Sequence, residues 1–572
     1  MILQALYDYY HRCGDLPRKG MELKEIGFLI VIDEDGNFIR LENRMIDKKH
    51  ASQFLVVQTV QRSGRKFVGN CLWDNCDYVI GYSEKNPEKA ELCKEAFTER
   101  VKQLLNVFPQ NIVLRAIYSF YKKYPCVYDI ISKDPLWYEM YTSTKNISFI
   151  INGSKHIAAE DSDIINFSCS SDDNIEANIC LVTGLRGKTA RIHAKVPLQG
   201  NSFTSLVSFK DGKGYDSYGK SQGTNAPVSE KAEFAYTTAI NHLLANNSRN
   251  KFILSTRTFL FWASKNNDAG QKAEESFFSL FGFNEQEDDP NKNIEQVRKV
   301  FEAIYNGTLK TTSEDIFYIL GLAPNAARIA VTYWAEIPLR KFAETIRKHF
   351  DDMEIEDTRP EKKPYMSLRN MISEVTPKGK VADATPNLAD TVVKSIFEGL
   401  PYPQTLFASC IRRIRAESGE KDKNAVHITR AAIIKAYLNR LNNNEQKIKR
   451  MLDKDNNNQG YLCGRLFAVL DKIQEDANNQ HSIRERYMNA ASATPATVFA
   501  TILNLSSHHA ENLNEGRKIY FEKIKQEIID KISADGFPSH LDLQDQGRFF
   551  VGYYHQRQDF FTKTEKENNN NN

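Results

Sequence analysis

The feature that most restricts the fold is a change in hydrophobic patterning along residues 351–387. This stretch carries four prolines and many charged side chains but little periodic apolar signal, which is typical of a linker or an irregular crossing. Residues 1–350 mix strand-like and helical runs, whereas residues 388–563 show helical periodicity without a convincing strand. We therefore predict an α+β chain: a mixed strand and helix region at 1–350, a linker at 351–387, a helical bundle at 388–563 and a polar, disordered tail at 564–572.

Local patterns in the N-terminal region predict individual strands and helices. A turn at Asp33–Gly36 joins two apolar runs and predicts a β-hairpin, and a second pair of apolar runs flanks residues 61–66. Apolar side chains spaced three and four residues apart predict helices, one of which has Ser229 as its N-cap. The predicted strands are Phe28–Ile32, Phe38–Leu41, Gln53–Val60, Phe67–Leu72, Ile147–Ile151, Ile179–Val182, Phe203–Phe209 and Phe252–Trp262, and the predicted helices are Pro87–Leu105, Asn111–Tyr124 and Ser229–Leu244.

Two helix patterns stand out in the C-terminal region. Thr494 followed by Pro495 is typical of a helix start. The run Gln544–Phe561 predicts a helix with Phe and Tyr side chains along one arc, with Arg557 pointing into that arc and Arg548 and His555 facing away. Because an unpaired buried charge is costly, we expect Arg557 to be a paired or stacked structural anchor.

Composition excludes several classes of protein. The chain has 572 residues, of which 41% are hydrophobic and 26% charged, and this balance is typical of an ordered globular protein with more than one buried core. Its net charge of +3 is far from the strongly basic totals of histone-like proteins, so a nucleic-acid surface has to be a local patch. The chain has neither a signal-peptide pattern nor an apolar run of about 18 residues, and we predict a cytoplasmic protein without membrane contact.

No residue pattern points to catalysis or metal binding. The nine cysteines lack the C-x-x-C spacing of zinc and thiol-redox sites. The run Gly184–Thr189 ends like a phosphate-binding P-loop but is two residues too short between its glycines, so we interpret it as a basic hairpin turn. Other imidazole and carboxylate pairs point apart on a helix or stand in turn-like contexts; they are His508/His509, Asp33/Asp35 and Asp161/Asp163. We therefore predict no catalytic residue, no metal site and no cofactor, and expect that the protein is not an enzyme.

Two segments have a local excess of positive charge. Between Arg186 and Lys220 there are seven Lys or Arg and two Asp side chains, and tyrosines alternate with glycines. Glycines let the backbone approach phosphates, cations neutralise them and rings stack on unpaired bases. An exposed flexible loop has the same composition, so both interpretations stay open. The candidate contacts to a nucleic-acid backbone are Arg186, Lys188, Lys210, Lys213, Tyr215, Tyr218 and Lys220.

The second basic segment, Arg412–Arg465, contains thirteen Lys or Arg and six Asp or Glu side chains. Its helix near Val426–Leu441 has an apolar stripe, with Arg430 and Arg440 elsewhere on the helical wheel. A helix that buries its stripe and exposes its cations can follow a phosphate backbone, although a solvated basic face has the same pattern. The candidates are Arg412, Arg413, Arg430, Lys435, Arg440 and Lys447.

Long and unusual strings in the chain resemble one family. They are LWDNCDYVIGY, YDSYGKSQGTNAPVSEKAEFAYTTAINHLL, LGLAPNAARIAVTYW, GRLFAVLDKIQEDAN, ASATPATVFATILNL and QDQGRFFVGYYHQRQDFF. These strings are similar to the large subunit of type I-C CRISPR surveillance complexes (Cascade, the Csd family). The similarity runs from the first helix almost to the tail, and the helical half resembles the small subunit of such complexes.

The resemblance implies a part in RNA-guided antiviral defence. A large subunit of this kind lies beside the subunit that holds the 5′ handle of the CRISPR RNA and works together with the backbone subunits. It inspects duplex DNA for a short protospacer-adjacent motif, helps to part the strands and guides the displaced strand, while base pairing to the RNA reads the target. A separate helicase-nuclease is recruited in trans and cuts the DNA, so the subunit itself is not expected to be catalytic.

The resemblance also suggests which residues meet DNA. For the flanking motif we predict a basic hairpin and, as a second choice, amide side chains that can reach base edges. These candidates are Arg62, Arg65, Lys66 and Asn70, followed by Gln222 and Asn225. For the displaced strand we predict the six candidates of the second basic segment.

The family further implies a second product of the same gene. In type I-C systems the small subunit is made from an internal start, and Met451 is the preferred candidate because it would yield 122 residues, whereas Met488 would leave 85. Two hypotheses from other classes remain: a nuclease or RNA-processing enzyme of the same defence system, and a scaffold that bridges RNA-bound subunits without touching DNA.

Overall fold

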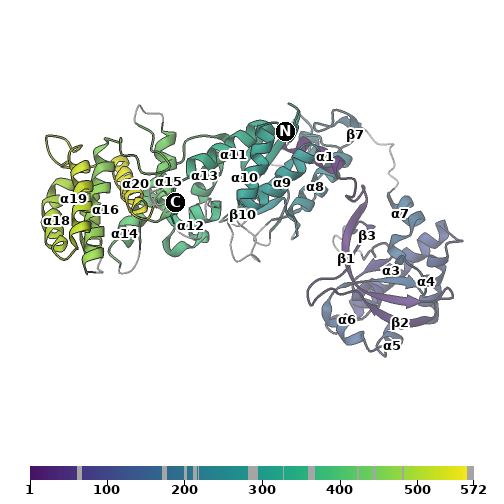
Figure 1. The fold of residues 1–572 in the computed structure, drawn as a ribbon. Helices are drawn as coiled ribbons and strands as arrows, with labels where there is room; N and C mark the ends of the chain where they lie inside the picture. The colour runs from purple at the N-terminus through teal and green to yellow at the C-terminus, as the bar shows by residue number, and fades with distance from the viewer. Residues whose placement is uncertain are drawn as a thin grey trace, which may run out of the picture. The chain divides into compact units, whose positions relative to one another are not determined.

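The computed structural model of the chain describes residues 1–60, 67–169, 177–198, 202–209, 216, 218–245, 247–254, 256–280, 294–325, 328–358, 367–384, 386–420, 424–441, 446–478 and 482–562. The chain forms two compact units, each built from separate stretches. The first unit contains Met1–Arg12, His193–Phe209 and Ala239–Asn572, and the second contains Cys13–Ile192 and Lys210–Thr238. Neither unit ends near residue 350, where a domain boundary was expected. Figure 1 labels the elements along the chain.

The second unit contains a five-stranded sheet. Its strands are β1 (Met21–Ile32), β2 (Phe38–Asn43), β3 (Gln53–Val57), β4 (Trp73–Asp74) and β5 (Asn146–Ile151). Strand β1 pairs antiparallel with β2 and β3 and parallel with β5, which in turn pairs with β4. The β1–β2 pairing confirms the predicted hairpin. Residues 26–32 of β1 are all buried, as expected for a strand covered on both faces.

Helices cover this sheet and share its core. They are α2 (Cys76–Val79), α3 (Pro87–Val107), α4 (Ile112–Lys123), α5 (Val127–Ile131), α6 (Trp137–Ser143), the 3-10 turn η1 (Ala158–Glu160) and α7 (Ser162–Cys169). Phe97 of α3, Phe120 of α4 and Phe149 of β5 are fully buried in one cluster. Asn111 accepts a hydrogen bond from the amide of Leu114 and so caps α4. The predicted helices at 87–105 and 111–124 are therefore confirmed.

The predicted strand Phe67–Leu72 is wrong. Residues 67–72 form no strand, and β3 pairs with β1 instead. Leu72 has a φ of 62°, which an extended strand does not tolerate. The Asn70 amide also donates to the Asp74 carboxylate at 2.9 Å, which folds the chain back on itself. The turn predicted at 61–66 lies outside the described residues.

Short elements follow the first sheet. They are β6 (Ala177–Ile179), β7 (Arg186–Lys188), β8 (Val196–Leu198), β9 (Ser202–Thr204), the 3-10 turn η2 (Gln222–Asn225) and α8 (Glu230–Leu244). Strands β6 and β7 form one antiparallel pair, and β8 and β9 form another. The strands predicted at 179–182 and 203–209 are thus shorter and begin earlier than expected. Helix α8 is confirmed with its N-cap, because the Ser229 hydroxyl accepts from the amide of Ala232 at 3.3 Å.

A second sheet lies in the first unit. Strands β10 (Lys251–Leu254), β11 (Arg257–Ala263), β12 (Ile316–Asn325) and β13 (Arg328–Pro338) pair antiparallel in chain order. The single strand predicted at 252–262 is therefore a hairpin. Helix α1 (Ile2–Arg12) packs on this sheet, since the Arg12 guanidinium donates to the Ala263 carbonyl and to Glu274, each at 2.8 Å. Helices α9 (Asp268–Leu280), α10 (Ile294–Tyr305) and α11 (Leu339–Met353) share its core.

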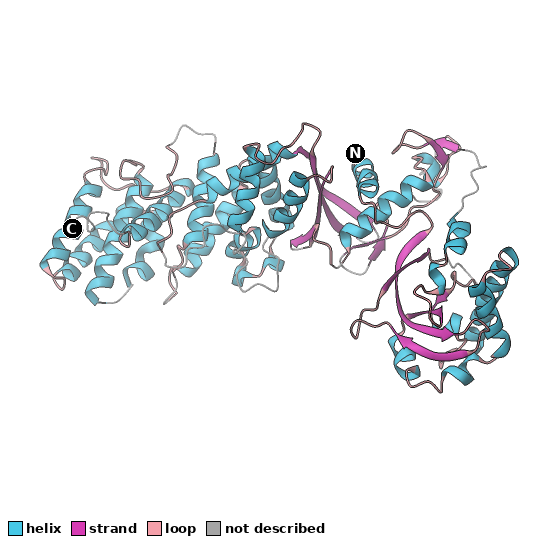
Figure 2. Cartoon of the chain, turned by 45° about the vertical axis from the view of Figure 1, so that its right-hand side comes forward, coloured by secondary structure: helices cyan, strands magenta, loops and turns pink. Residues whose placement is uncertain are grey.

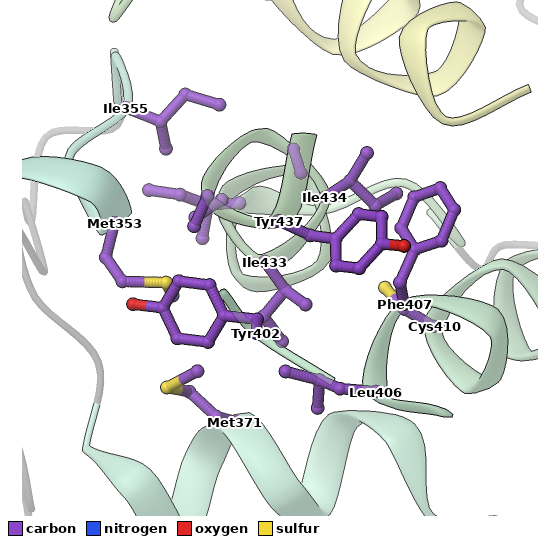
Figure 3. Packing of buried hydrophobic residues seen from close by; sticks show 14 of the residues in the cluster. Met353, Ile355, Met371, Tyr402, Leu406, Phe407, Cys410, Ile433, Ile434 and Tyr437 are labelled. Carbon is purple, nitrogen blue, oxygen red and sulfur yellow. The ribbon is translucent and has the colours of Figure 1, made fainter. Parts of the chain in front are cut away.

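Beyond β13 the described chain contains helices and no strand, as predicted (Figure 2). After α11 come α12 (Leu368–Val375), α13 (Pro386–Glu398), α14 (Gln404–Glu417), α15 (Ile428–Arg440), α16 (Gln459–Asn478), α17 (Ser482–Ala493), α18 (Pro495–Ala510), α19 (Glu515–Ile529) and α20 (Leu543–Asp559). Helix α12 lies within the predicted linker, yet Met371 and Ile372 are fully buried. These helices and the second sheet share one hydrophobic cluster, part of which is shown in Figure 3. None of the described helices is long and apolar enough to cross a membrane.

Helix α20 packs against α16 at glycine positions. A Cβ added to Gly464 would lie 1.9 Å from the Phe549 carbonyl oxygen, and one added to Gly552 would lie 2.3 Å from that of Tyr461. This close approach buries α20 from Gln546 to Gln556. Arg548 and His555, which were predicted to face away from the aromatic arc, are buried as well, because α20 is covered on all sides over this stretch. Arg557 binds Glu475 at 2.6 Å and Asp471 at 3.5 Å, which confirms it as a structural anchor.

Candidate nucleic-acid interface

The β6–β7 hairpin lies with one face against the start of helix α8. Asn178 pairs with Gly187 in the hairpin ladder. A Cβ added to Gly187 would lie 2.9 Å from the Cβ of Ser229, so this face of the hairpin sits directly on the helix N-cap. The GKT-like string is the basic hairpin predicted from the sequence, and Gly187 is required there for close packing.

Backbone hydrogen bonds fix the hairpin in this position. The amide of Leu181 donates to the Pro227 carbonyl at 2.8 Å, and that of Ala190 to the Val228 carbonyl at 2.9 Å. The Ser229 amide donates to the Cys180 sulfur at 3.2 Å. Burial raises the pKa of the Cys180 thiol, but hydrogen bonds from Ser229 and Thr183 outweigh it and bring the pKa down to about 7. The hairpin is thus held on both sides of its turn.

In the described part of the chain, one carboxylate at the start of α8 binds two lysines. Glu230, the first residue of α8, accepts from Lys188 at 2.9 Å and from Lys19 at 3.1 Å. Burial raises the pKa of Glu230, but these two lysines outweigh it and hold the pKa below its ordinary value. Glu230 therefore stays ionised and compensates one of the two cations. Arg186 is exposed and forms no ion pair within the described part of the chain, so its guanidinium is free to meet an anion.

The η2 turn lies against Ala190 and Arg191, which follow strand β7. Gln222 accepts from the Arg191 guanidinium at 2.9 Å. The Asn225 amide nitrogen donates to Asp216 and to the Gln222 carbonyl, each at 3.1 Å. A Cβ added to Gly223 would lie 2.0 Å from the Ala190 carbonyl oxygen. Of the two predicted base-reading amides, Asn225 is therefore committed to the turn, whereas Gln222 is half-buried with its side-chain oxygen bonded.

The structure describes only part of the glycine-rich segment. Tyr218 is 99% exposed, and Lys220 is exposed beside η2. The other three candidates, Lys210, Lys213 and Tyr215, lie outside the described residues. The structure thus places Lys188 beside the first residue of α8, Arg186 on the same strand, and Tyr218 and Lys220 just before the η2 turn.

The prediction that α15 exposes a basic face is wrong, because this helix is buried on all sides. Arg430, Lys435 and Arg440 are at most 8% exposed. Figure 3 shows apolar side chains of the same helix within the core, where Tyr437 stacks on Phe407 with ring centroids 4.2 Å apart. None of the three cations can reach a displaced strand without unfolding the helix.

Each buried cation of α15 has oxygen partners from other parts of the chain. Arg430 binds Glu417 at 2.6 Å, and Lys435 donates to the Asp352 carbonyl at 2.9 Å. Burial lowers the pKa of Lys435, although Asp352 opposes the shift. Arg440 binds the Asp352 carboxylate at 2.6 Å and covers the Tyr402 ring at 4.2 Å. Such compensation makes the burial of charge tolerable.

The other candidates for the displaced strand lie nearer the surface. Arg412 is exposed on α14, and Arg413, one residue on, is half-buried and paired with Glu417. Lys447 is exposed and donates to the Asn439 carbonyl. These three do not form one basic face with α15, because the cations between them are buried.

The predicted hairpin for the flanking motif is only partly described. Arg62, Arg65 and Lys66 lie outside the described residues. Asn70 is 2% exposed, and its side-chain oxygen accepts from the Val60 amide at 3.0 Å. This contact makes Asn70 a support for the ends of the 61–66 segment rather than a group that reaches a base.

Metal-binding clusters are not found among the described residues, where no group of three His, Cys, Asp or Glu side chains could hold a metal ion. Asp33 accepts from the amides of Asp35 and Asn37 at 3.0 and 2.7 Å. Asp161 accepts from the amide of Ile164 at 3.2 Å at the start of α7. Both carboxylates serve local turns, as the sequence predicted.

Sequence reasoning missed the apolar side of the hairpin. Ile179, Leu181 and Leu185 are 60%, 57% and 70% exposed. An apolar run such as Ile179–Val182 usually marks a buried strand. Arg186, which follows Leu185 directly, is the signal that could have indicated exposure, because an Arg in a buried strand needs a partner.

Comparison with known proteins assigns the family. No curated protein gives a significant match to the chain. A family model described as CRISPR-associated protein (Cas_Csd1) matches residues 6–561, from helix α1 to just past the end of α20. Because this match covers nearly the whole sequence, the chain belongs to the Csd1 family of CRISPR-associated proteins.

Proposed function

We propose that the protein is the large subunit of a type I-C CRISPR-RNA-guided surveillance complex that recognises the protospacer-adjacent motif in duplex DNA. Family membership over nearly the whole chain supports a part in such a complex. The observation that carries the DNA-binding part is the β6–β7 hairpin, which is fixed on the start of α8 and presents Arg186 and Lys188 to solvent. Cations on a rigid support bind sugar-phosphate without reading sequence.

We infer the following division of labour from the family and from the exposed cations. The cationic hairpin holds the duplex, and the 61–66 segment next to Asn70 inspects the flanking bases. Base pairing with the CRISPR RNA then reads the target. The subunit works together with the handle-binding and backbone subunits, and a helicase-nuclease recruited in trans cleaves the DNA. The displaced strand follows exposed cations such as Arg412 and Lys447, not the buried cations of α15.

Removing exposed charge at the hairpin should weaken DNA binding in a salt-dependent way. We expect the assembled complex with Arg186→Ala and Lys220→Ala to bind target duplex more weakly across sequences. The slope of log affinity against log salt should fall by about one to two, since each lost phosphate contact removes about one released counterion. The measurement is a filter-binding or gel-shift titration at several salt concentrations.

The matched control removes two exposed cations from α3, Lys89→Ala and Lys102→Ala, and should leave the slope unchanged. If both double variants have the same slope of log affinity against log salt, Arg186 and Lys220 do not contact DNA phosphates. Ultraviolet crosslinking of the wild-type complex to its target separates the remaining hypotheses. Absence of any crosslink to this subunit favours a DNA-free scaffold, and cleavage by the purified subunit with Mg²⁺ or Mn²⁺ favours a nuclease.

We propose Met451 as the internal start, in the segment that joins α16–α20 to the preceding chain. Met451 is 55% exposed. Before it, the Arg450 carbonyl accepts from the Glu356 amide at 3.0 Å. After it, the amide of Asp453 donates to the Tyr461 hydroxyl at 3.1 Å, and Asn458 donates to Asp545 at 3.0 Å. A product that begins at Met451 would keep the contacts within α16–α20 but would lose the packing of α20 on α14 and α15 and the hydrogen bond from Tyr554 to the Glu356 carbonyl.

A second product of 122 residues, the small subunit, should therefore copurify with the complex. Mass spectrometry of the expressed complex measures it directly. Met451→Ala should abolish the short product while leaving the full chain folded, because this side chain is exposed. Met488→Leu is the control, because leucine keeps the volume of this buried side chain, and it should leave the product in place. A short product that survives Met451→Ala would begin elsewhere, and its absence from the wild-type complex would refute the proposal.

A further inference from the structure

The second sheet, β10–β13, has one face in the main core and a row of aromatic rings on the other. Phe261 and Phe317 belong to the main hydrophobic cluster. Successive side chains of a strand point to opposite faces, so Trp262, Tyr318 and Trp334 lie on the face away from that cluster. Their ring centroids are 5.4, 5.6 and 5.9 Å apart, and the three rings therefore form one continuous aromatic surface.

Helix α1 covers only one end of this row. The ring of Tyr9 stands edge-on to Trp262, with centroids 6.2 Å apart, and Trp262 is fully buried. Tyr318 and Trp334 are half-buried and stack on each other with an angle of 14° between their planes. Part of their ring surface is thus open to a partner.

Two carboxylates border the open rings. Glu336 lies directly opposite Tyr318 in the β12–β13 ladder and is 48% exposed. Its ion pair with the N-terminal amine of Met1, at 3.7 Å, is too exposed to be strong. Asp8 is exposed on α1 and forms no ion pair within the described part of the chain. Burial raises the pKa of Tyr318, and the negative charges of Glu336 and Asp8 raise it further, so the phenol stays neutral beside two negative groups.

Elsewhere in this chain, a ring beside a carboxylate binds an arginine. Arg440 lies over the Tyr402 ring at 4.2 Å while its guanidinium binds Asp352 at 2.6 Å. Arg12 lies over Tyr9 at 4.8 Å and binds a glutamate of α9 at 2.8 Å. In both cases the guanidinium meets a π-face and a negative charge together, which is the combination that Arg prefers. The aromatic row and its two carboxylates offer the same combination at the surface.

Within the described residues, no cation lies over Tyr318 or Trp334. We propose that these two rings, with Asp8 and Glu336, form a docking site for an arginine side chain of a neighbouring protein subunit in the assembled complex. The guanidinium lies on Trp334, the best ring for a cation, and donates to the carboxylates. A nucleic acid fits this site poorly, because the same carboxylates repel phosphates. The inference rests on the proposed function in one respect, since it assumes that the protein works in a multi-subunit complex.

The first test reverses both charges with Asp8→Lys and Glu336→Lys in the full chain. Both side chains are exposed, so the core stays intact. Native mass spectrometry of the complex over a dilution series, without DNA, measures how readily this subunit dissociates. We expect about a tenfold or greater loss of affinity, because like charges across an interface are strongly disfavoured. The matched control is Glu95→Lys with Glu275→Lys, which reverses exposed carboxylates of α3 and α9 and should leave the affinity unchanged. An unchanged affinity of the Asp8 and Glu336 variant would overturn the site.

The second test separates a cation–π contact from a merely apolar one. Trp334→Leu keeps an apolar side chain without a π-face, whereas Trp334→Phe keeps a ring. We expect about a threefold or greater loss of affinity for the leucine variant and a smaller loss for the phenylalanine variant. Urea unfolding of each variant confirms that it is folded. Equal affinities of the two variants would contradict an arginine contact.

Photocrosslinking identifies what covers the rings. With p-benzoyl-phenylalanine in place of Trp334, we expect a crosslink to another protein subunit, at a peptide that contains arginine. A crosslink to RNA or DNA instead would mean that bases stack here and would overturn the proposal. The proposed function is measured separately, by binding of target DNA to the wild-type complex. A complex that holds this subunit through Trp334 but ignores target DNA would contradict the proposed function and leave the docking site in place.

Discussion

Replacing Arg440 with methionine should destabilise the helical region by about 3–5 kcal/mol, the usual cost of breaking a buried ion pair on one side. The Arg440 guanidinium binds the Asp352 carboxylate at 2.6 Å and donates to the carbonyls of Ser395 and Leu400 at 2.7 and 2.6 Å. Methionine fills similar space but leaves all three oxygens without this donor. It also removes the contact with the Tyr402 ring.

Urea unfolding of the purified full-length chain, followed by circular dichroism, measures the change in the free energy of unfolding. The matched control is Arg412→Met, which removes an exposed cation from α14 and should change stability by no more than about 0.5 kcal/mol. If the Arg440→Met protein is as stable as the wild type but binds DNA more weakly, Arg440 contacts DNA and is not a structural ion-pair partner.

Replacing Gly464 with alanine should separate α16 from α20 and cost about 3 kcal/mol, the upper end of the range for overpacking. The added Cβ would lie 1.9 Å from the Phe549 carbonyl oxygen. That oxygen belongs to the backbone of a buried helix, so it cannot swing away like the end of a side chain. Alanine normally stabilises a helix by about 1 kcal/mol relative to glycine. A net loss of stability in this variant therefore has to come from the clash between the two helices.

The control is Gly516→Ala near the start of α19, where the nearest atom to the added Cβ would be 3.6 Å away. This variant should be neutral or slightly more stable than the wild type in the same unfolding measurement. Equal stability of the two variants would mean that α16 and α20 can move apart at little cost. Because both helices follow Met451, Gly464→Ala should also lower the yield of the short product.

Hydrophobic periodicity predicted several of the long elements, but not strands β12 and β13 or helix α16. The β1–β2 hairpin and helices α3, α4, α8, α18 and α20 lie where their spacing and caps placed them, because these signals are local. Family membership was also readable, since the matching strings are long and spread over the chain. The short strands were predicted less well: Leu72 takes a positive φ, and the strand expected at 252–262 is divided into β10 and β11, which pair antiparallel.

Local charge misled the search for a binding surface. Thirteen cations between Arg412 and Arg465 suggest a basic face, but the partners of the α15 cations come from elsewhere. Asp352 precedes Arg440 by 88 residues, and no spacing rule connects positions so far apart. The β6–β7 hairpin shows the opposite error. The apolar residues Ile179 and Leu181 have the pattern of a buried strand, yet both are exposed.

The amino-acid sequence by itself determined the α+β class, the strandless C-terminal region and the family, because periodicity and motif identity are properties of the linear chain. Tertiary structure alone decided which charges meet water. Whether a cation is buried depends on an acid or carbonyl that another segment brings to it, as Asp352 does for Arg440. Whether an apolar strand residue such as Ile179 is exposed depends on which strand face is already occupied, as Ser229 occupies the Gly187 face of the β6–β7 hairpin.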